Sequence, residues 1–207
     1  MFHFSGSRLE GECECIKLLL ELEPFGVYPD FRKSLILRWG SSSGDVANLA
    51  YIQKNGQVWT NEVSASLGNR ELVLSAHPLG HTNNDLTVLD VNTGTLILGD
   101  LLFNGHTPAL DGSAKGWKAV IQDLTKLPAK RAVPGHGLVA LAWPSGALPL
   151  VRYLDTLIED TRTELDAGAS MLEAVERIAD GERDNWLQFD HYNKRNATVT
   201  YQELEWE

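Results

Sequence analysis

Three residues with metal-binding side chains stand where apolar segments of this sequence end in loops. They are His81 in "GHTNND", Asp100 in "LILGD" and His136 in "PGHG", separated by 19 and 36 residues. Loops that follow strands present their side chains into a shared cleft, whereas a histidine inside an amphipathic run is more often a core residue. The pattern therefore indicates three potential ligands of one metal site.

The remaining chemistry-bearing residues fit simpler interpretations. Only Pro78, Leu79 and Gly80 separate His77 from His81, which excludes a zinc-binding histidine pair on one helix, so we expect His77 to pack at a strand end. His191 is expected on a helix surface. The sequence has two cysteines, Cys13 and Cys15, and no second cysteine pair that would complete a tetrahedral metal site. They are either ordinary small side chains or, together with a distant histidine, a separate metal site.

Composition and charge restrict the class of protein. A chain of 207 residues with 43% hydrophobic and 22% charged residues is typical of one globular domain. The net charge of −10 argues against nucleic-acid partners and anionic membrane surfaces. No apolar run reaches the roughly 20 residues that membrane insertion needs, and the first residues carry no signal sequence, which predicts a cytoplasmic protein. The oligomeric state stays open.

The elements needed to position the three ligands can be predicted from residue 48 onwards. Residues 48–60 form two β-prone runs around an Asn-Gly pair, which is typical of a hairpin. Residues 70–77 alternate like a strand, and residues 86–100 predict a second hairpin with strands apolar enough to be covered on both faces. Residues 130–137 read as a strand that ends at His136.

Helical spacing follows the second hairpin. Ser113 is a plausible N-cap for a helix that buries Trp117, Val120, Ile121 and Leu124 and ends before Pro128. Residues 150–168 predict an amphipathic helix that stops at Gly168, and Ser170 with Glu173 has the pattern of a capping box. The tail, 197–206, fits either a last helix or an edge strand.

The first 47 residues give weaker signals. Residues 12–23 predict a short helix that ends at Pro24, and residues 24–47 read as irregular chain around one apolar run. The order of elements predicts a mixed sheet with covering helices. No dinucleotide-binding G-x-G-x-x-G, no phosphate loop and no G-x-S-x-G nucleophile elbow is present.

Together with their flanks, the three ligand positions carry a resemblance. "GHTNNDLTVLD", "LILGDLLF" and "VPGHG", in that order, resemble the C-terminal half of metallo-β-lactamase-fold hydrolases. "GHTPALDGSAKGW" and "FDHYNKRNATVTYQELEWE" look like the branch called quinoprotein relay system zinc metallohydrolases. The resemblance covers roughly residues 58–207.

The resemblance implies an α/β fold, the four-layer αββα sandwich, with two zinc ions at the edges of its sheets. By matching position, His81 would bind the first zinc, Asp100 would bridge both, and His136 would bind the second. Imidazole nitrogen and carboxylate oxygen suit zinc. A metal-activated hydroxide would then hydrolyse a lactam, ester or thioester of a small-molecule substrate.

Two further residues gain roles beside these ligands. Asp85 would hold the His81 loop by hydrogen bonds, as carboxylates near ligating histidines do, or else it is a plain surface aspartate. His106 would line the mouth of the cleft, or else it is an ordinary loop histidine.

The family's other ligands come from an early H-x-H-x-D-H, which residues 1–80 lack. We therefore expect an irregular or divergent segment at 1–57, a C-terminal part of the fold at 58–207, and an N-terminally incomplete sandwich from an exported or periplasmic parent. With the reduced ligand set the chain is either a zinc hydrolase, impaired to some degree, or a non-catalytic remnant or interaction module without metal.

Overall fold

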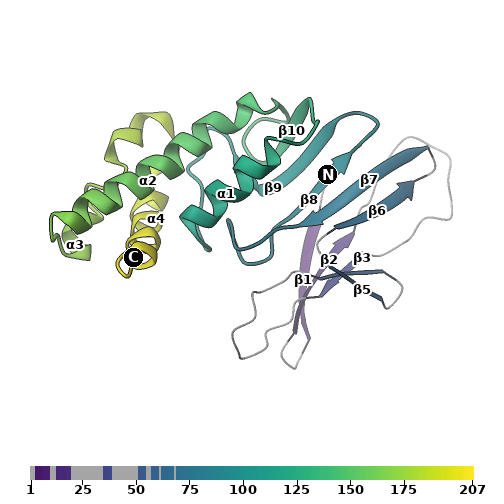
Figure 1. Cartoon of the computed structure of the whole chain (residues 1–207), viewed down its shortest axis with the longest axis horizontal. Coiled ribbons are helices and arrows are strands. Elements are labelled where there is room, and N and C mark those ends of the chain that lie inside the picture. Colours follow the sequence, from purple (N-terminus) through teal and green to yellow (C-terminus); the bar gives the residue numbers. More distant parts are fainter. Residues whose placement is uncertain are drawn as a thin grey trace.

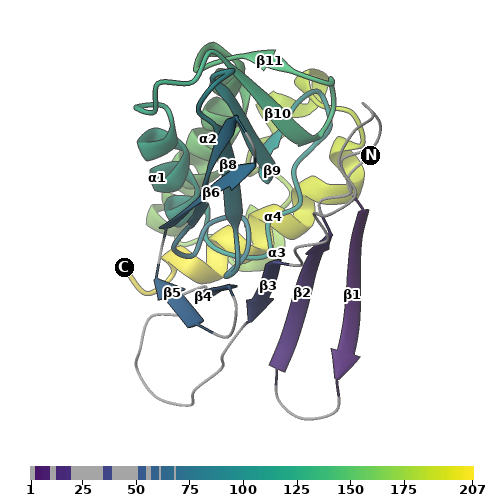
Figure 2. The ribbon, with the colours of Figure 1, turned by 90° about the vertical axis from the view of Figure 1, so that its right-hand side faces the viewer.

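The computed structural model describes residues 3–9, 13–19, 35–38, 51–54, 57–60, 62–67 and 69–207. The strands in the N-terminal part form one sheet and the later strands form another (Figure 2). All neighbours in the first sheet are antiparallel. Its order along the sheet follows the sequence: β1 (His3–Leu9), β2 (Cys13–Leu19), β3 (Leu35–Arg38), β4 (Tyr51–Lys54) and β5 (Gln57–Thr60).

The second sheet has six strands in the order β11-β10-β9-β8-β7-β6. Only β9 and β10 are parallel, because a helix connects them; the other neighbours are antiparallel. The strands are β6 (Glu62–Leu67), β7 (Arg70–Ala76), β8 (Leu86–Asp90), β9 (Thr95–Phe103), β10 (Arg131–His136) and β11 (Leu141–Ala142).

Helices cover the second sheet on one side (Figure 1). Helices α1 and α2 lie side by side, and α4 packs against α2. The α-helices are α1 (Ala114–Leu124), α2 (Leu148–Asp166), α3 (Met171–Ala174) and α4 (Phe189–Leu204), with short 3-10 turns η1 (Ser145–Ala147) and η2 (Asp180–Asn185). Two sheets with covering helices confirm the expected α/β class.

Most expectations for 48–207 are confirmed. Both hairpins form, with β4 paired to β5 and β8 paired to β9. Ser113 caps α1, its hydroxyl accepting the Gly116 N–H at 2.8 Å, and Ser170 with Glu173 makes the capping box. The tail, left open between helix and strand, is the helix α4.

The helix predicted for residues 12–23 is wrong. Cys13–Leu19 is the strand β2, which pairs with β1 on one side and β3 on the other. Glu, Lys and Leu favour a helix in isolation, but backbone pairing on both sides outweighs such weak local preferences. The division at residue 57 stays a prediction; the described strands change from one sheet to the other between Thr60 and Glu62.

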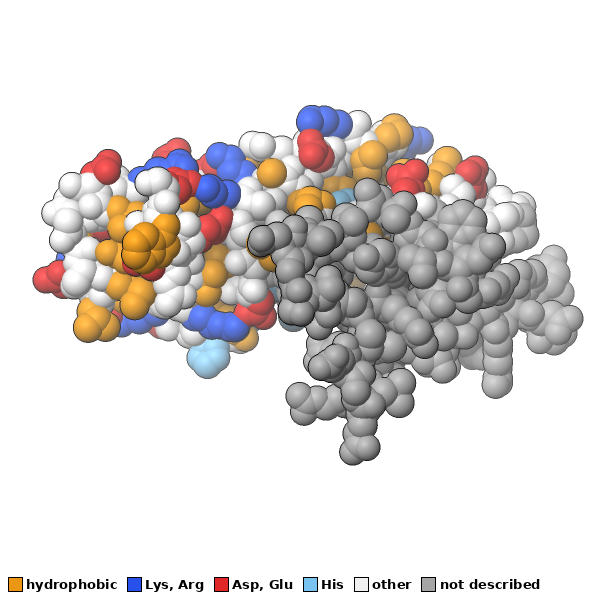
Figure 3. All heavy atoms as spheres, turned by 60° about the horizontal axis from the view of Figure 1, so that its bottom comes forward, with side chains coloured by type: hydrophobic (Ala, Val, Ile, Leu, Met, Phe, Trp, Pro, Cys, Tyr) orange, Lys and Arg blue, Asp and Glu red, His pale blue; other side chains and the backbone are white. Residues whose placement is uncertain are grey.

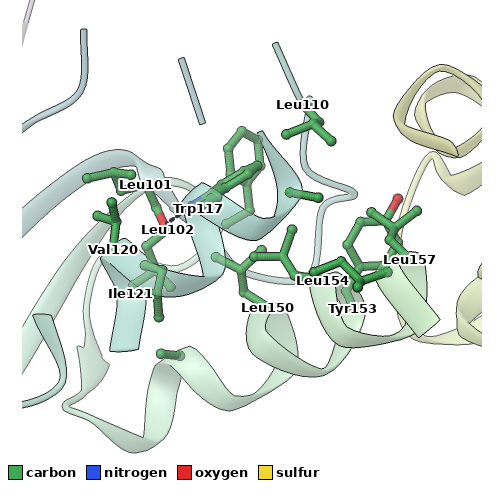
Figure 4. Close-up of a cluster of buried hydrophobic side chains, with 14 of the residues drawn as sticks. Leu101, Leu102, Leu110, Trp117, Val120, Ile121, Leu150, Tyr153, Leu154 and Leu157 are labelled. Carbon is green, nitrogen blue, oxygen red and sulfur yellow. Dashed lines mark hydrogen bonds between the residues drawn. The ribbon is translucent and has the colours of Figure 1, made fainter. Parts of the chain in front are cut away.

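The core lies between the second sheet and its helices. Trp117, Leu150, Tyr153 and Leu154 are fully buried, and Figure 4 shows the α1 and α2 side chains facing one another. Each large apolar side chain buried here contributes about 1.5 to 3 kcal/mol relative to an exposed one. The indole N–H of Trp117 donates to the Leu101 carbonyl at 3.0 Å, so helix α1 is also tied to strand β9.

The outer surface of the helical layer mixes charges of both signs (Figure 3). Several of these charges pair, as Lys194 does with Glu176 at 2.6 Å and Arg177 with Glu164 at 2.5 Å. Exposed pairs of this kind contribute little stability, on the order of 0 to 1 kcal/mol each. In the part of the chain that the structure describes, no helix combines the length and apolarity needed to cross a membrane.

Candidate metal centre

Asp100 owes its position to a bulge in β9. Gly99, just before it, has a φ of 53°, a left-handed conformation that favours glycine, and the register between β9 and β10 shifts at this point. The alternation of buried and exposed side chains breaks there too, since Leu98, Leu101 and Leu102 are buried while Asp100 is exposed. The bulge therefore turns the carboxylate out of the packed sheet.

His136 reaches the same place from the neighbouring strand. It is the last residue of β10, and its Nε2 lies 3.4 Å from Oδ1 of Asp100. Both side chains are half exposed. Gly135 makes this approach possible, because a Cβ at that position would lie 2.1 Å from the Asp100 carboxylate. The two predicted ligands are thus brought together.

His81 lies in the loop between β7 and β8 and is buried. Its Nδ1 faces Oδ1 of Asp85 at 3.5 Å. The Asp85 carboxylate also accepts the Thr82 backbone N–H at 3.0 Å and the Thr82 hydroxyl at 2.8 Å. Asp85 therefore holds the loop as a whole, and it leaves the other imidazole nitrogen, Nε2, facing away from the carboxylate.

A histidine cluster, composed of His81, His106 and His136, surrounds the ring of Phe103. The ring of His136 stacks on Phe103 with centroids 4.6 Å apart, while those of His81 and His106 lie 5.8 and 6.3 Å away. Trp117 closes the buried side, 5.0 Å from the His81 ring and 6.0 Å from Phe103. The three imidazoles therefore share one apolar support.

The hydrogen-bond partner of His106 identifies which of its ring nitrogens carries a hydrogen. Its Nδ1 lies 2.8 Å from the Thr107 carbonyl oxygen, which can only accept, so Nδ1 carries a proton and donates it. Its ring stacks beside His136 with centroids 5.6 Å apart and meets Tyr192 of α4 edge-on at 5.2 Å. A neutral His106 consequently has its lone pair on Nε2.

Two exposed apolar residues lie near histidines of the cluster, Leu187 near His106 in space and Val139 near His136 in sequence. Leu187 is bridged to His106, its N–H donating to the Gly105 carbonyl at 2.8 Å, and its side chain is 71% exposed. Val139, three residues after His136, is 90% exposed. Leu187 therefore places one exposed apolar residue beside the polar donors, a combination found in sites that bind small molecules.

The donors match zinc in kind, since it takes imidazole nitrogen and carboxylate oxygen. Asp100 and His136 form a close pair of such donors, with Gly135 leaving room for the carboxylate. His81 is not part of that pair: within the described ranges, no three His, Cys, Asp or Glu side chains are grouped closely enough to hold a metal ion. The side chains of Cys13 and Cys15 lie outside the described part.

Sequence reasoning missed several residues of this site. Phe103, Tyr192 and Leu187 carry no metal-binding or catalytic signature, and their proximity to the histidines arises only from folding. One signal was present in the sequence. Gly99 interrupts an apolar strand, and an isolated glycine in a strand often marks a bulge.

Two solved structures resemble this fold. The stereoselective inverting sec-alkylsulfatase Pisa1 from Pseudomonas sp. has a TM-score of 0.58 and 15% identity, over 77% of this chain and 28% of the sulfatase. A metallo-beta-lactamase family protein from Thermus thermophilus has a TM-score of 0.53 and 17% identity, over 74% of this chain and 49% of that protein. The chain thus spans half or less of their lengths.

The sequence itself also matches a family model. No curated protein sequence matches the chain, but the model of the metallo-beta-lactamase superfamily matches residues 17–136, more than half of its length. The matched stretch contains His81 and Asp100 and ends at His136. The chain therefore belongs to the metallo-beta-lactamase superfamily.

Proposed function

We propose that this chain is a zinc-dependent hydrolase that cleaves a lactam, ester or thioester bond in a small molecule. Membership of the superfamily supports hydrolysis in general. The observation that carries the proposal is the approach of Asp100 to His136, 3.4 Å apart where the adjacent parallel strands β9 and β10 leave regular pairing. Strand bulges that re-aim a side chain, as the one at Gly99 does for Asp100, are frequent next to active sites.

Asp100, His136 and His81 are the residues that would hold zinc. Asp100 and His136 lie together, and the His81 loop would have to move toward them for all three to share one ion. A zinc ion bound by them would supply Lewis-acid activation of water and of the substrate carbonyl. Two histidines and one carboxylate are a sufficient protein ligand set for a single catalytic zinc. We accordingly propose one zinc ion per chain.

The other residues of the site serve these donors. Asp85 accepts a hydrogen bond from the His81 loop and orients the ring so that Nε2 is available. Phe103 fixes the plane of His136 by stacking, and His106 offers Nε2 as a hydrogen-bond acceptor beside it. Leu187, which lies beside His106, would contact an apolar group of the substrate.

We also propose membership of the quinoprotein relay system zinc metallohydrolase branch. The two segments that carry this resemblance, 105–117 and 189–207, contact each other at several points. Asn196 of α4 bonds the backbone of Pro108 and Leu110, at 2.7 and 3.0 Å, and Arg195 pairs with Asp111. The two segments therefore pack as one unit, and the branch proposal rests on their sequence resemblance.

Zinc content tests the function. After dialysis the purified chain should retain about one equivalent of zinc, and His136→Ala and Asp100→Asn should each reduce it below about 0.1 equivalents. His191→Ala, which removes an exposed histidine from α4, is the matched control and should retain the metal. Content below about 0.1 equivalents in the parent chain would contradict the proposal and favour a non-catalytic module.

The cysteine alternative has its own test. If Cys13 and Cys15 hold the metal, changing both to serine removes zinc while His81→Ala leaves it in place. The proposal predicts the reverse: the double serine variant keeps its zinc affinity, and His81→Ala lowers it without abolishing binding, because Asp100 and His136 remain. Zinc content and hydrolysis of a chromogenic thioester or lactam, measured on the same samples, decide between these sites.

A further inference from the structure

The backbone that carries His81 is held by the residues just before α1. The Asp111 N–H donates to the His81 carbonyl at 3.1 Å, and the Ser113 N–H donates to the Gly80 carbonyl at 2.9 Å. Two consecutive carbonyls of the His81 loop therefore depend on one short segment, residues 111–113. Its position sets the position of the histidine.

Glycines allow the His81 loop and helix α1 to approach this closely. A Cβ on Gly112 would lie 2.2 Å from the Gly80 oxygen, and a Cβ on Gly116 would lie 2.1 Å from the Leu79 oxygen. No side chain fits between the two segments, so any shift of residues 111–116 moves the loop with them.

The far side of residues 111–116 is held by Glu203, near the end of α4. Its carboxylate accepts the Ser113 hydroxyl at 2.5 Å and the Ala114 backbone N–H at 2.8 Å. The same Ser113 oxygen accepts the Gly116 N–H, so Glu203 completes the N-terminal cap of α1. A carboxylate is favoured there because the helix N-terminus exposes unpaired N–H groups.

We infer that Glu203 is a positioning residue for His81, acting through the capped start of α1 and residues 111–113. The chain of contacts runs from the Glu203 carboxylate to Ser113 and Ala114, and from Ser113 to Gly80. The His81 ring completes the link, since it packs edge-on against Trp117 of α1 at 5.0 Å. The last helix thereby sets one of the proposed zinc ligands, which rests on the function proposed above.

A double-mutant cycle separates positioning from general stability. Glu203→Gln keeps the shape of the side chain but cannot accept both hydrogen bonds, and zinc affinity should fall about 10-fold, as when other partners behind metal ligands are changed. In a His81→Ala background the same change should alter zinc affinity less than about 2-fold. An equal loss in both backgrounds, or none in either, overturns the inference.

Glu176→Gln is the matched control, because Glu176 also binds α4, through Lys194, but lies on the exposed surface. It should leave zinc affinity unchanged in both backgrounds. Ser113→Ala removes the Glu203 hydrogen bond from its other end and should reproduce the Glu203→Gln result. Thermal unfolding of each variant shows whether it is folded.

A metal-free measurement decides the inference even if the chain binds no zinc. In histidine-ring nuclear magnetic resonance spectra of the apo chain, Glu203→Gln should shift the His81 ring signals and leave those of His191 unchanged. Amide exchange at Asp111 and Ser113 should accelerate in the same variant. Unchanged His81 signals would refute the positioning role, whereas a lack of zinc alone refutes only the proposed function.

Discussion

The Asp100 carboxylate lies 3.4 Å from Nε2 of His136, although 36 residues separate them in the sequence. Helix α1 makes this approach possible, because it connects β9 to β10 as a crossover and so carries the chain back to a parallel neighbour. Both residues then lie where these neighbouring strands leave regular pairing. Packing of α1 on the sheet is therefore a condition for the site.

Gly135 provides the most direct test of this approach. In Gly135→Ala the new Cβ would lie 2.1 Å from the Asp100 carboxylate and 2.7 Å from the Gly99 carbonyl carbon. We expect a loss of unfolding free energy of about 1 to 3 kcal/mol, as for other overpacked positions, and a displaced carboxylate. Urea unfolding gives the first quantity and zinc affinity reports the second.

Gly181→Ala is the control for that substitution, since nothing lies within 4 Å of its Cβ position. It should change the unfolding free energy by less than about 0.5 kcal/mol. If Gly135→Ala is equally harmless in both measurements, the close approach of Gly135 to Asp100 is not required.

Much of the second sheet and its helices could be predicted from sequence, because local signals and tertiary packing agree there. The apolar alternation of 86–100, the Ser113 cap and the spacing of Trp117 to Leu124 each indicate the structure that forms. The prediction for β2 was wrong for the opposite reason: its residues favour a helix locally, but its backbone pairs with β1 on one side and β3 on the other.

The possible metal ligands of the site could be predicted from the sequence, but the residues that pack around them could not. His81, Asp100 and His136 have side chains whose chemistry is recognisable alone, whereas Phe103 is one apolar residue among many until the fold places histidines around it. Their mutual distance was also beyond sequence reasoning, and only the Asp100 and His136 pair is close. Asn196 gave no signal because its role depends entirely on tertiary hydrogen bonds.

Asn196→Ala should be strongly destabilising. Its side chain is fully buried, accepts the Leu110 N–H at 3.0 Å and donates to the Pro108 carbonyl and the Tyr153 hydroxyl at 2.7 and 2.8 Å. Each buried partner left without a hydrogen bond costs about 1 to 3 kcal/mol, so we expect a loss of about 3 kcal/mol in urea unfolding. Thr198→Ala, on the exposed side of α4, is the control.

The effects of Tyr153→Phe and Asn196→Ala on the unfolding free energy should be coupled. The Tyr153 hydroxyl donates to Asn193 and accepts from Asn196, so both variants remove the same Tyr153 to Asn196 bond. The double variant should therefore lose less unfolding free energy than the sum of the two single losses, by about 1 kcal/mol. Strict additivity would show that the two residues are not coupled.

The ion pair of Glu182 should contribute stability that is lost at low pH. The Arg152 guanidinium donates to its carboxylate at 2.7 and 2.9 Å and, despite its burial, holds the pKa of Glu182 below the ordinary value, helped by the Trp186 N–H. A lowered folded pKa contributes stability that is present above the unfolded pKa of about 4.5 and is lost as the pH falls through the folded value. Glu182→Gln should cost about 2 kcal/mol at pH 7 and progressively less as the pH falls below about 4.5.

His77 should also make the stability depend on pH. Unlike Glu182 it is a base, and the folded structure disfavours its charged form. Its Nε2 is hydrogen-bonded to the buried Thr87 hydroxyl at 2.8 Å, and burial lowers the pKa of His77 although the Asp85 and Asp123 carboxylates oppose the shift. The unfolded chain therefore binds more protons than the folded chain between the lowered pKa and about 6.5. Stability is full above that window and decreases as the pH falls through it. His77→Gln can still bond Thr87, and its urea unfolding midpoint should fall less between pH 7.5 and 5.5 than that of the parent chain. The control His191→Gln should show the same fall as the parent. An unchanged slope in His77→Gln would assign the effect to another group.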